Sequence, residues 1–182
     1  MPLFLLVISL FLSTVTPRQG WDQRVGDQLA LLVSIQNQTL YGIQEGKILF
    51  EYSCSTAAKG IGNTQGSYQT PLGWHKIDEK IGDRVPLRGI FKKRVFTGDI
   101  WDGTLQSEDL VLTRILLLRG LETGINIGPG IDTYNRCIYI HGTNEESKLG
   151  TPASHGCIRL SNWDVRALYT RIPKGTLVLI IN

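Results

Sequence analysis

The stretch that decides both the fold and the chemistry reads Ser154-His155-Gly156-Cys157-Ile158-Arg159-Leu160. A thiol becomes a competent nucleophile when a nearby base takes its proton or a positive charge lowers its pKa. Two imidazoles are available: His155, two residues before Cys157, and His141, sixteen residues before it. His155 is a poor candidate for the base if this stretch is extended, although it would share a face with Cys157. An adjacent strand would instead bring His141 opposite the thiol, so we expect Cys157 as nucleophile and His141 as general base.

The residues around Cys157 suggest supporting roles and leave alternatives open. Gly156 frees the backbone before the nucleophile, so the amides of Gly156 and Cys157 could face a developing oxyanion. Arg159 offers a rigid fork suited to a substrate carboxylate. Alternatively, the histidines are structural and Cys157 is an inert buried thiol. A zinc site of His141, His155 and Cys157, with or without His75, is a further alternative, but His-x-Cys is not a usual chelating pair.

Two further blocks accompany this stretch. His141-Gly142-Thr143 lies sixteen residues upstream of the thiol, and residues 70–77 read T-P-L-G-W-H-K-I. Together with the segment 136–140 before the histidine, with Ser154 to Leu160, and with Asp164, these blocks resemble the signature of the L,D-transpeptidase catalytic domain. The resemblance covers roughly residues 28–181. One departure is His75, where the family more often has an aromatic or aliphatic residue, and we interpret it as a packing variation.

The resemblance implies a fold and a set of roles. The fold is mostly β, an L,D-transpeptidase-type β-sandwich with one or two short helices and a flap insertion. Cys157 is the nucleophile, His141 accepts and returns the proton, and the carbonyl of Gly142 orients His141. No cofactor and no metal are expected. The oxyanion and substrate-binding residues expected from the motif are His155, Gly156, Arg159, Gly142 and Ser154.

The implied activity is acyl transfer on peptidoglycan stem peptides. Cys157 would attack a stem tetrapeptide, expel its terminal D-alanine and pass the acyl group from a thioester to an amine acceptor. Carbapenem-type β-lactams are the inhibitors that the resemblance implies. The nearest alternative is an L,D-carboxypeptidase, a hydrolase with the same Cys and His. A papain-like peptidase is disfavoured because His141 precedes Cys157, and a non-catalytic wall-binding module would not need to keep both residues.

Hydrophobic periodicity predicts a mostly β domain over residues 27–182. The run at residues 78–109 is rich in glycine and lacks sustained periodicity, which predicts an irregular, mobile flap. Ser161 with Asp164 predicts the start of a helix, which Pro173 and Gly175 would end. The expected strands cover residues 28–35, 39–43, 47–52, 110–118, 136–140 and 176–181, and the expected helix covers residues 162–171.

Composition narrows the function class. The net charge is +3, and the densest basic run is Lys92-Lys93-Arg94. We expect that run to be a solvated loop rather than a contact for an anionic polymer, and nucleic acid is not indicated as a partner. Three cysteines do not make a disulfide framework, and Cys54 and Cys137 either pair or, as we favour, remain free small hydrophobic residues.

The N-terminal segment suggests export. Residues 2–15 are apolar but too short for a comfortable membrane span of about 20 residues, so residues 1–20 suit a secretory signal peptide or an N-terminal membrane anchor. No Lys or Arg precedes the apolar run, and no small-x-small cleavage site follows it. We expect an exported protein of the periplasm or cell envelope, with residues 2–15 as a candidate membrane tether.

Overall fold

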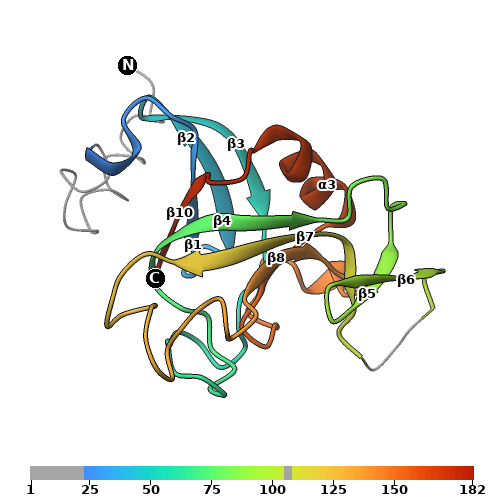
Figure 1. Ribbon diagram of the computed structural model, residues 1–182. Coiled ribbons are helices and arrows are strands. Elements are labelled where there is room, and N and C mark those ends of the chain that lie inside the picture. The colour runs from blue at the N-terminus through green and yellow to red at the C-terminus, as the bar shows by residue number, and fades with distance from the viewer. Residues whose placement is uncertain (1–22, 105–107) are drawn as a thin grey trace.

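A computed structural model of the protein describes residues 23–104 and 108–182 (Figure 1). The expectations for residues 1–20, the signal or tether among them, lie outside these residues. No helix within the described ranges is long and apolar enough to cross a membrane. The strands are β1 (Ala30–Ser34), β2 (Thr39–Gln44), β3 (Lys47–Ser53), β4 (Gly73–Ile81), β5 (Gly89–Lys92), β6 (Val95–Ile100), β7 (Val111–Gly120), β8 (Tyr139–Gly142), β9 (Ile158–Leu160) and β10 (Leu177–Ile181), and the helices are α3 (Asn162–Arg171) and the 3-10 helix η1 (Glu146–Lys148).

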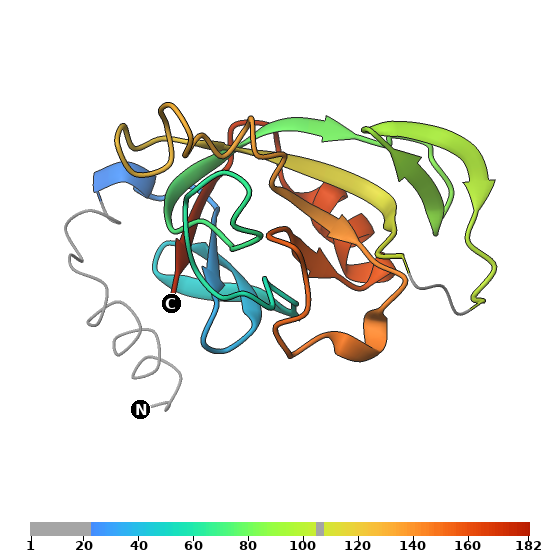
Figure 2. The same ribbon diagram turned by 90° about the horizontal axis from the view of Figure 1, so that it is seen from below.

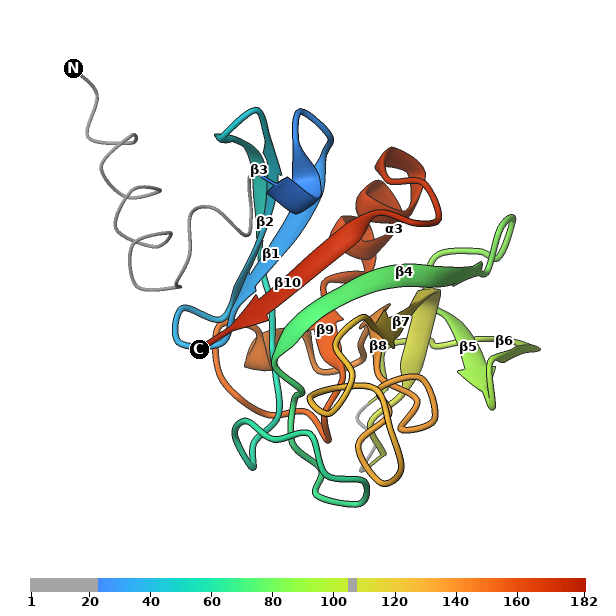
Figure 3. The ribbon, with the colours of Figure 1, turned by 60° about the vertical axis from the view of Figure 1, so that its left-hand side comes forward.

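The strands form one mixed sheet in the order β3-β2-β1-β10-β4-β7-β5-β6 (Figure 3). Outside this order, β8 pairs with β7, and β9 pairs with β8. The pairs β1–β10 and β8–β9 are parallel, and the other pairs are antiparallel. The strands expected at residues 28–35, 39–43 and 47–52 are confirmed as β1, β2 and β3, which form an antiparallel meander. The chain therefore brings its first and last strands together at the centre of the sheet, and it carries the motif residues on the short β8–β9 branch.

The mostly β fold is confirmed, and its sandwich-like core forms because the sheet bends round a hydrophobic interior. Side chains alternate along β1, so Leu31 faces one apolar cluster while Leu32 faces another. The larger cluster joins Leu31 to Ile140 of β8, Ile158 of β9 and Leu168 of α3. Burial on both faces explains the continuous apolar runs of β1 and β10. Figure 2 shows β8 and α3 lying under the arch of β4 and β7.

The predicted helix is confirmed as α3. Ser161 adopts an extended backbone, and its hydroxyl accepts a hydrogen bond from the amide of Asp164 at 3.0 Å. The hydroxyl also donates to the Asp164 carboxylate at 2.6 Å. This cap satisfies an amide that would otherwise be unpaired at the helix start. Val165 and Leu168 pack into the core, so α3 packs against β7 and β8.

Two expectations about local structure need correction. Residues 78–109 are not irregular throughout, because the end of β4 and the β5–β6 hairpin lie within them (Figure 1). Phe91 and Phe96 pair across that hairpin with ring centroids 6.1 Å apart. Lys93 and Arg94 form its turn with positive φ, whereas Lys92 is the last residue of β5, so the expected loop holds for only part of the basic run. The mobility of the flap stays a prediction. The strand predicted at 136–140 begins only at Tyr139 and includes His141.

Candidate active site

The motif residues meet where β8 and β9 run side by side. The parallel register pairs Ile140 with Ile158 and His141 with Arg159. Cys157 directly precedes β9, so it lies next to Tyr139. On the other side of β9, the backbone of Arg159 exchanges two hydrogen bonds with Ser55, each at 2.9 Å. The segment that carries the thiol is therefore fixed from both sides.

Alternation along the two strands brings Cys157 and His141 to one face. Ile140 and Ile158 point into the core, so Cys157 and His141, each one residue away from them, point to the opposite face. A residue two places along the neighbouring strand lies roughly 7–8 Å away, which is within reach of a long or aromatic side chain. The predicted pairing of strands is thus present, with the imidazole diagonal to the thiol.

The carbonyl of Gly142 fixes the tautomer of His141. His141 is buried, and its Nδ1 lies 2.8 Å from the Gly142 oxygen. A carbonyl can only accept, so Nδ1 carries the proton and Nε2 presents a lone pair. No side chain fits at Gly142, because a Cβ there would approach Asn162 Oδ1 to 2.6 Å and the Leu112 carbonyl to 2.8 Å. The residue type is thus required for the geometry that orients the base.

The thiol of Cys157 lies between two backbone groups. The amide of Tyr139 donates to Sγ at 3.4 Å, and Sγ lies 3.5 Å from the carbonyl of Cys137. Burial raises the pKa of Cys157 to about 12, and the amide of Tyr139 lowers it. Burial also lowers the pKa of His141. In the resting site both groups are therefore neutral, and the thiolate must form as the proton moves to His141.

The loop before the nucleophile is braced by hydroxyl groups. Ser154 Oγ donates to the carbonyl of Cys157 at 2.6 Å, and it accepts from the amide of Gly156 at 3.1 Å. Thr70 of the T-P-L-G block donates to the carbonyl of Gly156 at 3.1 Å. The expectation that the Gly156 amide faces an oxyanion is therefore wrong for this structure, because Ser154 occupies that amide. The amide of Cys157 itself stays the candidate donor.

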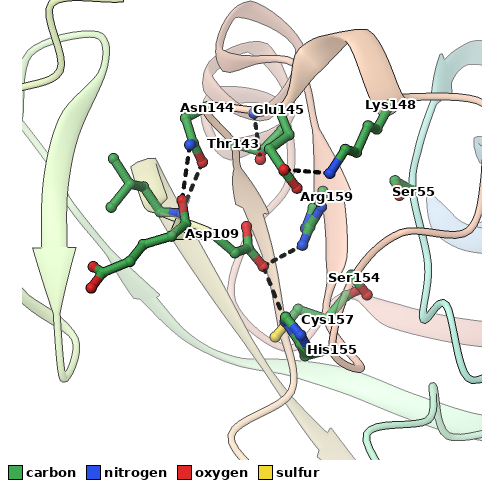
Figure 4. Close-up of polar contacts among 12 residues, drawn as sticks. Ser55, Asp109, Thr143, Asn144, Glu145, Lys148, Ser154, His155, Cys157 and Arg159 are labelled. Carbon is green, nitrogen blue, oxygen red and sulfur yellow. Dashed lines mark hydrogen bonds and ion pairs between the residues drawn. The ribbon is translucent and has the colours of Figure 1, made fainter. Parts of the chain in front are cut away.

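The role expected for Arg159 also needs correction. Its side chain is only 1% exposed, and its terminal nitrogens bind Asp109 and, at 2.7 Å, Glu145 (Figure 4). Lys148 also bonds to Glu145, at 2.5 Å. The fork predicted for a substrate carboxylate is thus directed to two protein carboxylates. Among the described residues, Arg159 Nε and Asp109 Oδ1 are buried without a hydrogen-bond partner.

His155 occupies the open rim of the site. Its side chain is 70% exposed, and Nδ1 lies 3.8 Å from Asp109 Oδ2 (Figure 4). Its ring meets the edge of Tyr68, with centroids 5.9 Å apart, and Lys59 Nζ lies 4.8 Å from the Tyr68 ring. An exposed imidazole beside the nucleophile suits contact with substrate better than proton transfer at the buried thiol.

The other cysteines and His75 lie in unrelated surroundings. Cys54 is buried in the core and Cys137 is exposed, and both are free thiols. His75 is fully buried, with its ring nitrogens 2.9 Å from the Gly73 carbonyl and 3.1 Å from the Thr133 hydroxyl, so it packs as interpreted. Across residues 23–104 and 108–182, no three His, Cys, Asp or Glu side chains gather in a way that could hold a metal ion.

Sequence reasoning missed four residues that shape the site: Thr70, Asp109, Arg136 and Glu145. Each reaches the motif through a contact between distant parts of the chain. The role of Thr70 could have been suspected from the sequence, because Thr70 is the first residue of the T-P-L-G block. Asp109 and Glu145 carried no local signal, since an acid beside a strand or a turn is ordinary on a protein surface.

Comparison with known proteins gives a consistent result. Residues 28–180 match the family description of the L,D-transpeptidase catalytic domain, YkuD. The chain is 47% identical over 177 residues to the probable L,D-transpeptidase ErfK/SrfK of Salmonella typhimurium, covering 91% of this chain and 51% of the relative, so it spans about half that protein's length. It is similar in fold to the L,D-transpeptidase of Xylanimonas cellulosilytica (TM-score 0.52, 18% identity, 92% of this chain and 71% of that one). It is also similar in fold to the L,D-transpeptidase LdtMt1 in complex with imipenem (TM-score 0.52, 17% identity, 86% of this chain and 60% of that one).

Proposed function

The chain belongs to the L,D-transpeptidase catalytic domain family, and from this premise we propose that it is a cysteine acyltransferase that acts on peptidoglycan stem peptides. One observation carries the proposal beyond family membership. Cys157 and His141 share one face of the β8–β9 ladder, and the Gly142 carbonyl leaves the Nε2 lone pair of His141 available. A neutral thiol beside a neutral, oriented imidazole is the arrangement that general-base activation of a nucleophile requires.

The proposed reaction has two steps. As His141 Nε2 takes the thiol proton, Cys157 Sγ attacks the carbonyl that joins the L-centre of the diaminopimelate (or equivalent) residue to the terminal D-alanine. The tetrahedral oxyanion is stabilised by the Cys157 amide. The C–N bond then breaks, and His141 returns its proton to the departing D-alanine amine, leaving a thioester. In the second step an acceptor amine forms a C–N bond to the thioester carbonyl while His141 takes its proton. The C–S bond then breaks, and His141 returns the proton to Sγ, which restores the thiol.

Burial accounts for the timing of proton transfer. Because the pKa of Cys157 is raised and that of His141 is lowered, an ion pair is costly in the empty site. The thiolate therefore forms mainly as the proton moves to His141 during attack on a bound substrate. We therefore infer that the thiol is protected from adventitious oxidation until a substrate binds.

The acceptor decides between transferase and hydrolase. An amine from a neighbouring stem, a protein or a free D-amino acid makes the enzyme an L,D-transpeptidase, whereas water makes it an L,D-carboxypeptidase. We propose the transferase, at the cell envelope where its polymer lies. Carbapenems are proposed inhibitors, supported by the imipenem complex of the structurally similar LdtMt1.

Product analysis tests the proposal. Purified protein is incubated with a disaccharide-tetrapeptide, with and without excess D-methionine, and the products are read by mass spectrometry. We expect crosslinked dimers without D-methionine and a D-methionine-exchanged product with it, neither of which forms with Cys157→Ala. A tripeptide formed at the same rate with and without D-methionine would favour the hydrolase. Intact substrate in all samples would refute both.

A further inference from the structure

One positive charge near Cys157 has no negative partner. Arg159 and Lys148 are matched by Asp109 and Glu145. Arg136 is half-buried, and no carboxylate of the described residues lies within ion-pair distance of its guanidinium. We propose that the guanidinium of Arg136 stabilises the Cys157 thiolate electrostatically, a role that rests on the proposed function of Cys157 as nucleophile.

The contacts of Arg136 hold it beside the nucleophile loop. Its terminal nitrogens donate to the carbonyl of Gly62 at 3.0 Å and to the carbonyl of Gln69 at 2.6 Å. The Gln69 oxygen packs on Gly156, where a Cβ would lie only 3.2 Å from it. The thiol of Cys157 in turn lies 3.5 Å from the carbonyl of Cys137, the residue directly after Arg136. The guanidinium is therefore held on the carbonyl that packs against Gly156, the residue directly before Cys157.

All the acceptors of Arg136 are neutral. Backbone carbonyls, and the Ser67 hydroxyl at 3.5 Å, satisfy its hydrogen bonds but leave its full positive charge uncompensated. A half-buried cation without a counter-ion is costly unless an anion appears beside it. Each acylation step produces such an anion at Cys157, first as the thiolate and then as the oxyanion two bonds from Sγ.

The charges coupled to the thiol support this assignment. Burial lowers the pKa of Arg136, whereas an ionised Cys157 raises it. The same attraction acts on the thiolate, for which Asp109, Arg159 and Cys137 are the larger charged influences. Asp109 raises the pKa of Cys157 more than Arg159 lowers it, so the buried ion pair supplies no net positive charge. The titratable groups whose charges act on the thiol are Cys137 and Tyr139, Asp109 from the segment before β7, and Arg159 from β9. His141 shares one face of the β8–β9 ladder with Cys157, and His155 is paired with Asp109.

Alkylation of Cys157 measures this effect without requiring turnover of any peptide. The rate with neutral iodoacetamide is followed from pH 6 to pH 11, and the rate with anionic iodoacetate is compared with it at pH 8. Modification is read at the Cys157 peptide by mass spectrometry, which excludes Cys137. The first variant, Arg136→Gln, keeps a hydrogen-bond donor but removes the charge. The second, Arg136→Lys, keeps the charge but lacks the planar guanidinium that bonds to two carbonyls. Arg166→Gln on the exposed face of α3 controls for net charge.

We expect Arg136→Gln to slow the iodoacetamide reaction about tenfold at each pH, because the whole range lies below the raised pKa of Cys157 and the loss of one neighbouring charge lowers the thiolate fraction about tenfold. The ratio of iodoacetate to iodoacetamide rates should fall several-fold. Arg136→Lys should recover at least half of both changes, and Arg166→Gln should change neither. An Arg136→Gln protein that folds and keeps the native iodoacetamide rate and the native ratio overturns the proposal. So does an Arg136→Lys protein as impaired as Arg136→Gln, because Arg136 would then only brace the loop.

The native protein provides a second measurement that needs no variant. Its ratio of iodoacetate to iodoacetamide rates at low salt is compared with that of N-acetylcysteine. We expect the ratio at Cys157 to be at least threefold higher and to decline towards the free-thiol value as salt is added, because salt screens charge. A ratio equal to or below that of N-acetylcysteine contradicts a net positive charge at the nucleophile, whether or not the protein transfers acyl groups.

Discussion

Replacing Arg159 with Met should lower the free energy of unfolding by about 3 kcal/mol at pH 7. The Arg159 side chain is 1% exposed, and the substitution removes the guanidinium that pairs with the carboxylates of Asp109 and Glu145. Removing one partner of a buried ion pair costs about 3–5 kcal/mol. The side chains of Asp109 and Glu145 are 20% and 22% exposed. Water therefore still solvates the two carboxylates in part, and the lower end of this range applies. Met keeps most of the apolar volume, so the cavity contribution is small.

The dependence of this loss on pH identifies its cause. Burial raises the pKa of Glu145, but Lys148 and Arg159 outweigh it and hold that pKa below its usual value. A carboxyl group with a lowered pKa in the folded protein stabilises the fold at pH values above its pKa in the unfolded chain. This stabilisation is lost as the pH falls through its pKa in the folded protein. The difference between Arg159→Met and the native protein should therefore narrow below about pH 4.5.

Urea unfolding at pH 7 and at pH 4 measures both effects. Lys148→Met is the matched control, because Lys148 meets the same Glu145 but is 51% exposed, and it should cost less than about 1 kcal/mol. If Arg159→Met costs no more than Lys148→Met at pH 7, the buried ion pairs do not hold the site together as argued.

Three further predictions concern backbone, protonation and inhibition. Gly156→Ala should lower stability by about 1–3 kcal/mol and slow Cys157 alkylation, because φ is +127° and the new Cβ would lie 3.2 Å from the Gln69 carbonyl; unchanged urea midpoints and alkylation rates would contradict this. Burial lowers the pKa of His75 to about 4, so the unfolded chain binds its proton first, and stability should fall by about 2 kcal/mol from pH 7 to pH 5. A His75→Gln variant with the same pH slope in urea titrations would refute that origin. A carbapenem, but not a simple penicillin, should add one lasting adduct at Cys157 in intact-mass spectra, and an adduct on Cys137 instead would count against the assigned nucleophile.

The central chemistry could be predicted from the sequence because it depends on short-range patterns. Cys157, His141 and Gly142 lie in compact motifs, and the strand before His141 supplies the pairing that brings the imidazole to the thiol. The central strands β1 and β10 could also be predicted from the sequence, because strands buried on both faces have continuous apolar runs.

The rest of the site depends on contacts that no local pattern encodes. Asp109 meets Arg159 across 50 residues of sequence, and Arg136 meets Gln69 across 67. The role expected for Arg159 was wrong because its fork suits any carboxylate, and the sequence cannot say whether that carboxylate belongs to substrate or protein. The β5–β6 hairpin was missed for a different reason, since β5 is only four residues long and β6 is almost wholly exposed.

Trapping the acyl-enzyme tests the central claim most directly. The protein is mixed with excess stem tetrapeptide, quenched in acid within seconds, and its intact mass is measured. We predict a mass increase equal to the tetrapeptide less its terminal D-alanine, located on the Cys157 peptide, absent from Cys157→Ala and strongly reduced in His141→Ala. The same mass increase in Cys157→Ala, or an acyl group found on Cys137 or Cys54, would show that Cys157 is not the nucleophile.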